Sequence, residues 1–188
     1  MPTALTRRFL TRPARLARAD GFARRRDGTA AVEFALVSAP FIALILAIIQ
    51  VGLIIYANQS LQTAAAAASR LILTGQAQTN NMTQSQFTQK VCNDASLFTC
   101  SGLMVDVRTY ASFAGADTSM PSLSYDGQGN VNNQWQYSPG GPGDIVVMRL
   151  MYRWPVFLGP LGLNLSNIPG GGYRLLMATA AFKNEPYK

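Results

Sequence analysis

The sequence has 188 residues, of which 48% are hydrophobic, and it carries 16 Lys and Arg against 9 Asp and Glu. Its net charge of +7 is concentrated at the start, because residues 1–28 hold eight arginines and only two aspartates. A basic tail beside an apolar segment is typical of a cytoplasmic topology signal, so nucleic acid is not an expected partner. The sequence contains no histidine, the commonest general base and metal ligand.

A long helix is predicted from Thr29 to about Thr74. Its first half includes residues 34–57, a stretch of 24 residues without charge. An α-helix of that length would reach about 36 Å, enough to cross a bilayer with some tilt. A secretory signal has an apolar region of only about 7–15 residues, so this segment indicates a retained anchor. Pro40 lacks a backbone donor and is predicted to kink or locally open the helix.

The second half of this helix is predicted to be amphipathic and to end near Gly75. The small side chains of Ala64–Ala68 permit close approach of another element. Two interpretations stay open here: packing on the chain's own domain, and contact with another subunit. The predicted apolar stripe consists of Leu61, Ala64, Ala65, Ala68, Leu71 and Ile72.

A polar linker is expected at residues 76–82, followed by a short helix from about Gln84 to Asn93. Thr83 and Gln86 fit a capping box, in which Thr83 is the N-cap and Gln86 reaches back to it. The apolar residues that follow recur at helical spacing.

The remaining chain predicts a small antiparallel sheet. Strands are expected at residues 103–110, 145–156 and 173–182, with a helix as the competing prediction for the third. Alternation of apolar and polar residues from Val105 to Arg108 indicates a strand with one buried face. Residues 115–143 are expected to form a long loop, which a short strand around Trp135–Tyr137 could interrupt. Residues 159–172 are expected to form a second connector.

The predicted fold class is therefore α+β: a long N-terminal helix, half transmembrane and half amphipathic, with a short second helix and a small antiparallel sheet. Three parts follow from this prediction. They are a cytoplasmic leader at 1–28, the long helix at 29–75 and an α+β domain at 76–188.

Cys92 and Cys100 are the only two cysteines. Their spacing differs from a CxxC redox motif and lacks the partners of a zinc site. A disulfide is the simplest use if this region lies outside the cytoplasm, and two independent buried thiols are the alternative. The sequence shows no catalytic motif, so neither enzyme activity, a cofactor nor a metal site is expected.

Glu33 raises a separate question, because an ionised carboxylate near the start of a membrane helix costs a few kcal/mol unless it is paired. Three partners could offset that cost. The first is the dipole of its own helix, if Glu33 lies in the first turn. The second is the cluster Arg24–Arg26. The third is a new ammonium at Thr29 on a neighbouring subunit, which exists only if the chain is cut after Gly28.

The stretch Arg24-Arg25-Arg26-Asp27-Gly28, followed by Thr29-Ala30-Ala31-Val32-Glu33, resembles the processing sites of type IV prepilins. The segment Gly-Thr-Ala-Ala-Val-Glu-Phe-Ala-Leu, residues 28–36, resembles the TadE-like family, the TadE and TadF pseudopilins of the tight-adherence (Flp) pilus system. Residues 56–65, the two cysteines and the closing segment 178–187 agree with that family. The resemblance is close over 28–70, good at the C-terminus and weak over 102–172.

This resemblance implies a minor, pilin-like subunit in Flp pilus assembly, cut between Gly28 and Thr29 by a prepilin peptidase. Glu33 is then the acid that pairs helices. The implied partners are the peptidase, other pilin-like subunits (Flp pilin and a TadF-like pseudopilin), the inner-membrane assembly machinery and membrane lipid. The chain would lie in a bacterial inner membrane, with a cytoplasmic N-terminus and a periplasmic C-terminal domain.

The chain departs from the Flp major pilins in two ways that favour a pseudopilin. It carries Glu33-Phe34 where those pilins have Glu-Tyr, and it has over a hundred residues beyond the helix. The alternative is an uncut, single-pass scaffold or binding module. A mitochondrial transit peptide also fits residues 1–27 by composition, but it explains neither Glu33 nor the closing segment.

Overall fold

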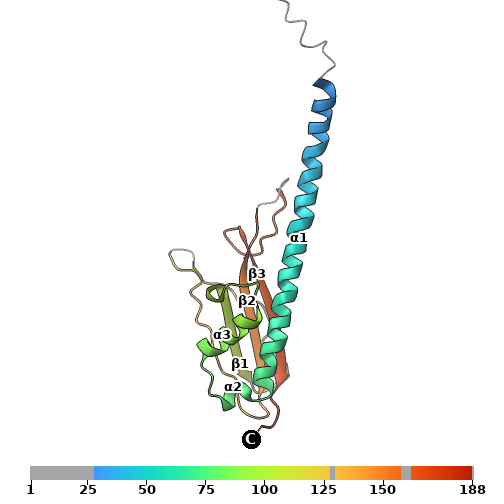
Figure 1. Cartoon of the computed structure of the whole chain (residues 1–188). Coiled ribbons are helices and arrows are strands. Elements are labelled where there is room, and N and C mark those ends of the chain that lie inside the picture. The colour runs from blue at the N-terminus through green and yellow to red at the C-terminus, as the bar shows by residue number, and fades with distance from the viewer. Residues whose placement is uncertain (1–27, 128–129, 158–161, 188) are drawn as a thin grey trace, which may run out of the picture. The chain divides into compact units, whose positions relative to one another are not determined.

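The computed structural model describes residues 28–127, 130–157 and 162–187 (Figure 1). The chain divides into two compact units, Met1–Phe41 and Ile42–Lys188, and the boundary falls inside the long helix. The sequence predicts other boundaries, at residues 28 and 75, which separate the leader, the long helix and the α+β domain by their expected place relative to a membrane. These boundaries stay a prediction. Arg24–Arg26, one of the three expected partners of Glu33, lies outside the described residues.

The long helix is α1, Thr29–Leu73, and its 45 residues confirm the predicted span. Pro40 lies inside this continuous helix, so the helix does not end there. The kink or local opening predicted at Pro40 stays a prediction. Gly75 adopts a left-handed conformation with φ of 77°, which turns the chain just after the helix. The expected linker then begins with a single turn, α2 (Gln76–Thr79), whose Ala77 is buried in the core.

The short helix is α3, Gln84–Asp94, and the predicted capping box is present. The Thr83 side chain accepts a hydrogen bond from Gln86 N, and Gln86 Oε1 accepts one from Thr83 N at 2.9 Å. Phe87, Val91 and Cys92 form the buried face of this helix. A turn of 3₁₀ helix, η3 (Cys100–Gly102), connects the region after α3 to the sheet.

The sheet contains three strands in the order β1-β2-β3, all antiparallel. Strand β1 spans Leu103–Tyr110, β2 spans Ile145–Pro155 and β3 spans Tyr173–Lys183. These bounds confirm the three predicted strands within a residue or two, and the competing helix at the third is wrong. Short 3₁₀ helix η4 (Phe113–Gly115) follows β1.

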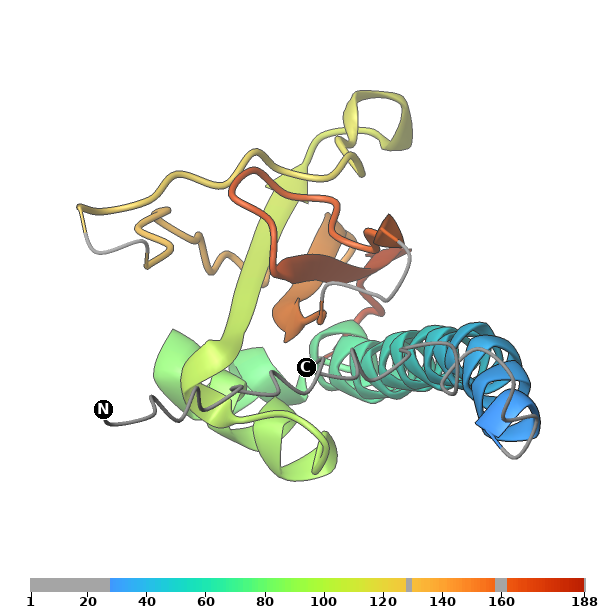
Figure 2. The ribbon, with the colours of Figure 1, turned by 90° about the horizontal axis from the view of Figure 1, so that it is seen from above.

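The sheet is covered on both faces. Figure 2 shows α1 and α3 on one side of the strands and the loop of residues 115–143 on the other. Because both faces are covered, β2 is buried on consecutive residues from Val146 to Leu150, in place of the alternation of a half-exposed strand. On the helix side, one stripe of α1 and the buried face of α3 pack against one face of the sheet to form the hydrophobic core. This core includes Leu61, Ile72, Phe87, Val107, Met148, Leu150 and Leu176.

Residues 135–137 do not form the expected short strand. They make only an isolated parallel bridge, between Tyr137 and Val107 of β1. Val107 N donates to Gln136 O at 2.8 Å, and Val107 O accepts from Ser138 N at 2.9 Å. The backbone hydrogen bonds between the described part of the long loop and β1 are therefore confined to Val107.

Candidate functional site

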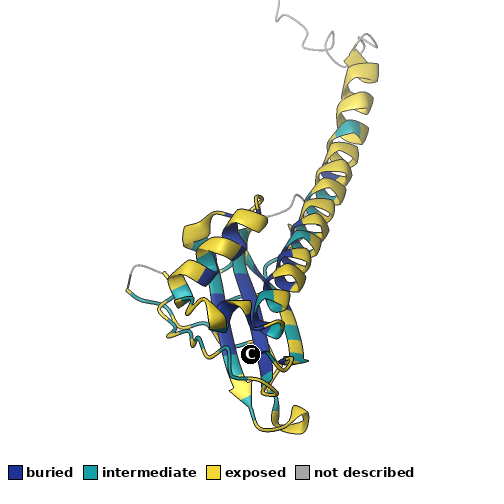
Figure 3. Ribbon diagram, turned by 60° about the horizontal axis from the view of Figure 1, so that its bottom comes forward, coloured by how far each residue is buried: buried dark blue, intermediate teal, exposed yellow. Residues whose placement is uncertain are grey.

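The N-terminal half of α1 exposes large apolar side chains. Figure 3 shows this part of the helix mostly in the colour of exposed residues. One helix among the described residues, α1, is long and apolar enough to cross a membrane. Water would meet this surface unfavourably, which indicates a bilayer or another apolar partner. The exposed residues are Val32, Phe34, Leu36, Val37, Phe41, Ile42, Leu44, Ile45, Leu46, Ile48, Ile49, Val51, Leu53, Ile55 and Tyr56.

Gly28, Thr29 and Glu33 lie at the start of α1 and are all exposed. A Cβ atom added at Gly28 would meet no atom within 4 Å, so packing does not require glycine there. Glu33 is the fifth residue of α1, and the first turn holds no acidic residue. The helix dipole, the first expected partner of Glu33, therefore stabilises this carboxylate less than it would in the first turn, since the dipole effect falls off within that turn.

The second half of α1 packs on its own domain through the predicted stripe. Ala64, Ala65 and Ala68 are buried in the core, whereas Ala66 and Ala67 are exposed. Of the two interpretations of the alanine run, packing on the chain's own domain is therefore correct for the three buried alanines. Only the opposite face of this half remains for a partner.

Cys92 and Cys100 form a disulfide, with their Cα atoms 5.4 Å apart. It joins the last turn of α3 to η3, directly before β1. The alternative of two independent thiols is wrong. The described residues include no free cysteine.

Replacing both cysteines with serine is expected to lower the free energy of unfolding by about 2–3 kcal/mol, because the bond closes a short loop in the unfolded chain. Urea unfolding of the full chain in detergent micelles, with and without the substitutions, measures this loss. The matched control is Thr99→Ser. This substitution also introduces a serine between the two cysteines in the sequence, but it keeps the disulfide. A double-serine variant as stable as the parent would contradict the expectation.

The face of the sheet under the long loop contains a buried ionic cluster that sequence reasoning missed. Asp106 and Arg149 face each other across β1 and β2, and they are only 1% and 2% exposed. Arg149 Nη1 lies 3.2 Å from Asp106 Oδ2, and Arg108 Nε lies 2.9 Å from the same oxygen. The expected exposed face of β1 is therefore wrong at Asp106, because the loop covers this carboxylate.

The loop itself completes this cluster. Gln136 N donates to Asp106 Oδ1 at 2.9 Å, and Arg149 Nη2 lies 3.1 Å from Asp117 Oδ2 and donates to Asp117 O. Hydrogen bonds from the Ser119 hydroxyl and backbone N–H, with Arg149 nearby, hold the pKa of Asp117 below its usual value. The cluster thus ties both ends of the long loop to the strands.

The closing segment Asn184–Tyr187 packs against the end of α1. Glu185 N donates to Leu73 O at 2.9 Å, and the Tyr187 hydroxyl lies 3.3 Å from Gly140 O. The buried Asn184 side chain donates to Pro139 O at 2.8 Å and to Gly141 O at 3.0 Å. This segment was noted in the sequence only as part of a resemblance, and the structure gives it a physical role in joining α1 to the turn before β2.

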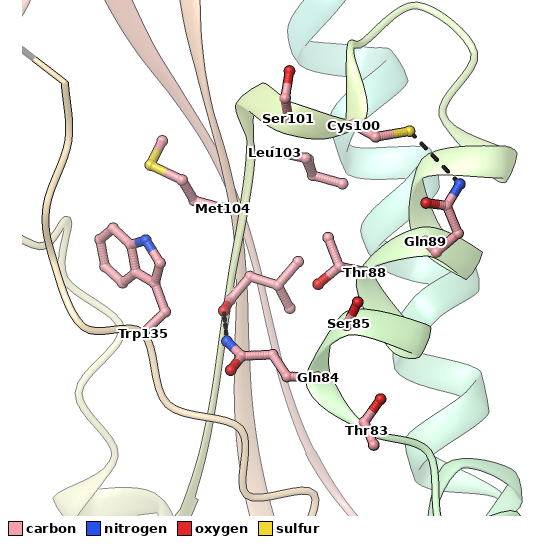
Figure 4. A pocket seen from close by; sticks show the side chains of 11 residues that line it. Thr83, Gln84, Ser85, Thr88, Gln89, Cys100, Ser101, Leu103, Met104 and Trp135 are labelled. Atoms are coloured by element: carbon pink, nitrogen blue, oxygen red, sulfur yellow. Dashed lines mark hydrogen bonds between the residues drawn. The ribbon is translucent and has the colours of Figure 1, made fainter.

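A cleft of about 670 Å³ lies between α3, the start of β1 and Trp135 of the long loop. Figure 4 shows Gln84 and Thr88 on one wall and Met104 and Trp135 on the other. Gln84 Nε2 donates to Val105 O at 3.2 Å and so occupies part of the strand edge. No residue that lines the cleft is charged, so the walls supply hydroxyl, amide and apolar groups.

These features define an α+β protein with one N-terminal helix long and apolar enough to cross a membrane and a disulfide in the domain that follows. Residues 28–70 match the family model described as TadE-like protein, which confirms the resemblance that the sequence indicates. The match begins at Gly28 and ends inside the amphipathic half of α1. No curated protein and no solved structure matches the chain.

Proposed function

We propose that the chain is a minor, pilin-like subunit that acts in the assembly of tight-adherence (Flp) pili. The observation that carries this proposal is the TadE-like match over residues 28–70, together with the exposed apolar surface of α1 in the same stretch. The role is structural: α1 packs laterally against other pilin-like helices in the inner membrane. The α+β domain then faces other assembly components.

Cleavage after Gly28 by a prepilin peptidase is part of this proposal. Gly28 directly precedes α1, and the fold places no steric demand on it. A glycine without a packing role is well explained as a recognition residue for the peptidase. The cut would remove the arginine-rich leader and leave Thr29 as the new N-terminus.

Glu33 then becomes a pairing acid. It lies four residues after Thr29, on the same side of the helix, and is exposed to neighbours. The new ammonium of one subunit would pair with Glu33 of the next, which offsets the cost of a carboxylate at the membrane boundary. This pairing sets the axial position of one helix against another.

The proposed topology has the N-terminus in the cytoplasm and the C-terminal domain in the periplasm. The eight arginines of the leader favour the cytoplasmic side for residues 1–28. The Cys92–Cys100 disulfide favours an oxidising compartment for the domain. Both signals give the same orientation for α1.

Cleavage is tested by producing the full chain with an active prepilin peptidase and measuring the mass of its mature N-terminus. We expect a chain that starts at Thr29. Gly28→Ala is expected to leave at least about nine-tenths of the chain uncut, because the added methyl group blocks a site shaped for glycine.

Gly52→Ala is the matched control, since a Cβ at Gly52 also meets nothing within 4 Å in the same helix. This variant should be cut like the parent. An intact leader on the parent chain in the presence of active peptidase would contradict the processing claim and favour the uncut scaffold.

A further inference from the structure

The connection between β2 and β3 reaches the apolar half of α1. Gln50 Nε2 donates to Phe157 O at 2.7 Å, two residues beyond the end of β2. Figure 1 shows β2 and β3 beside α1. The contact places one end of the sheet at the level of a residue within the uncharged stretch 34–57.

The lengths of the elements explain this contact. Eleven residues of β2 span about 37 Å at 3.4 Å per residue. The helix rises about 35 Å from Gln50 to Leu73 at 1.5 Å per residue. Because the closing segment binds Leu73 at the other end of the sheet, residues 153–157 and 173–174 lie at the end near Gln50, and these described residues are called the tip of the β2–β3 hairpin here.

The position of Gln50 then sets the depth of the tip. A hydrocarbon core about 30 Å thick takes about 20 helical residues. Counted from Phe34, the first residue of the uncharged stretch, those residues end near Leu53. Gln50 therefore lies about 5 Å inside the hydrocarbon boundary, and Phe157 lies beside it.

The side chains around the tip suit a lipid surface. Phe157 is 77% exposed although it is large and apolar. Tyr173 is also exposed, and the Arg153 guanidinium lies 4.4 Å from the centre of its ring. Arg174 stands next to Tyr173 in the sequence and adds a cation at this end of the sheet. Aromatic residues at an interface, with basic groups beside them, match anionic headgroups above an apolar core.

We propose that the tip of the β2–β3 hairpin is a second membrane contact, in which Phe157 enters the outer part of the same bilayer that α1 crosses. Tyr173 and Arg174 lie at the headgroups and favour anionic lipid. Gln50 satisfies the Phe157 carbonyl, which would otherwise lose its hydrogen bond in hydrocarbon. The inference rests on the proposed membrane anchor, and it fixes the tilt of the domain against the bilayer by a second point.

The test uses the full chain in vesicles of phosphatidylcholine and phosphatidylglycerol, with the photoreactive residue p-benzoylphenylalanine in place of Phe157. Illumination followed by mass measurement detects covalent lipid adducts. Phe113 is the matched control, since this phenylalanine is 56% exposed and follows β1 at the opposite end of the sheet. Leu46, half exposed on α1, reports the anchor itself.

We expect lipid adducts from positions 46 and 157, with a yield at 157 at least about five times that at 113. In the same labelled chain, Gln50→Leu should lower the yield at 157 several-fold. Adducts at 46 but not at 157 would overturn the second contact and leave the anchor standing. Adducts at neither position would overturn both, and a protein–protein adduct at 157 would assign the tip to a second copy of the chain instead.

Discussion

Arg149→Met is expected to lower the free energy of unfolding toward the lower end of about 3–5 kcal/mol, because it removes the buried cation beside Asp106 and leaves the partly exposed Arg108 to balance this buried carboxylate. Arg149 and Asp106 are both almost fully buried, and they are directly opposite each other in the sheet. Urea unfolding of the full chain in detergent micelles gives the difference. Loss of this arginine should also release residues near Asp117, seen as faster proteolysis of the long loop.

Two variants show whether charge burial is the reason. Lys183→Met removes an exposed cation from β3 of the same sheet and should change the stability by less than about 0.5 kcal/mol. The double variant Asp106→Leu, Arg149→Met removes both charges and should recover most of the loss. A double variant as unstable as Arg149→Met would contradict the role given to the loss of the buried cation beside Asp106.

Gly75→Ala is expected to lower the free energy of unfolding by about 2–4 kcal/mol. The left-handed conformation alone costs a residue with a Cβ about 1–2 kcal/mol. The added Cβ would also come within 2.2 Å of the Tyr187 ring, so the closing segment must move. The same urea titration measures the effect.

Gly115→Ala is the matched control, since its Cβ would meet only the Ser112 hydroxyl, at 3.5 Å. That change should be nearly neutral. Adding Tyr187→Ala to Gly75→Ala removes the collision but not the backbone cost, so the two substitutions together should cost less than the sum of each alone. Strict additivity would show that Tyr187 does not pack on Gly75 in solution.

The elements could be predicted from sequence because each carries a local signal. These signals depend only on residues that are close in sequence. They are the apolar stripe of α1 at the helical period of 3.6 residues, the Thr83 capping box, and the β-rich runs 103–110 and 145–156. The third strand was ambiguous, because its alanines favour a helix in isolation. Pairing with β2 over all eleven residues decides it, and that pairing is not local.

The buried ionic cluster could not be predicted for a related reason. Asp106 and Arg149 are 43 residues apart, and their meeting depends on the register of β1 against β2. A shift of one residue would place each charge on the opposite face. The polar loop over this face gave no signal that it would cover a carboxylate. At the N-terminus, by contrast, the roles of Gly28, Thr29 and Glu33 were predicted from a resemblance carried by a short contiguous motif, and they stay a prediction.

The contacts of the closing segment bear on the order in which the chain folds during its synthesis. Asn184–Tyr187 are made more than a hundred residues after the end of α1, yet they bind the end of α1 and the turn before β2. At about 5–20 residues per second, the roughly 110 residues after Leu73 take several seconds or more to synthesise. The stripe of α1 therefore stays uncovered until its later partners in the sheet, such as Met148 and Leu176, have been made. In that interval the stripe is open to other helices and to chaperones, and the sheet covers it only after its strands have been made.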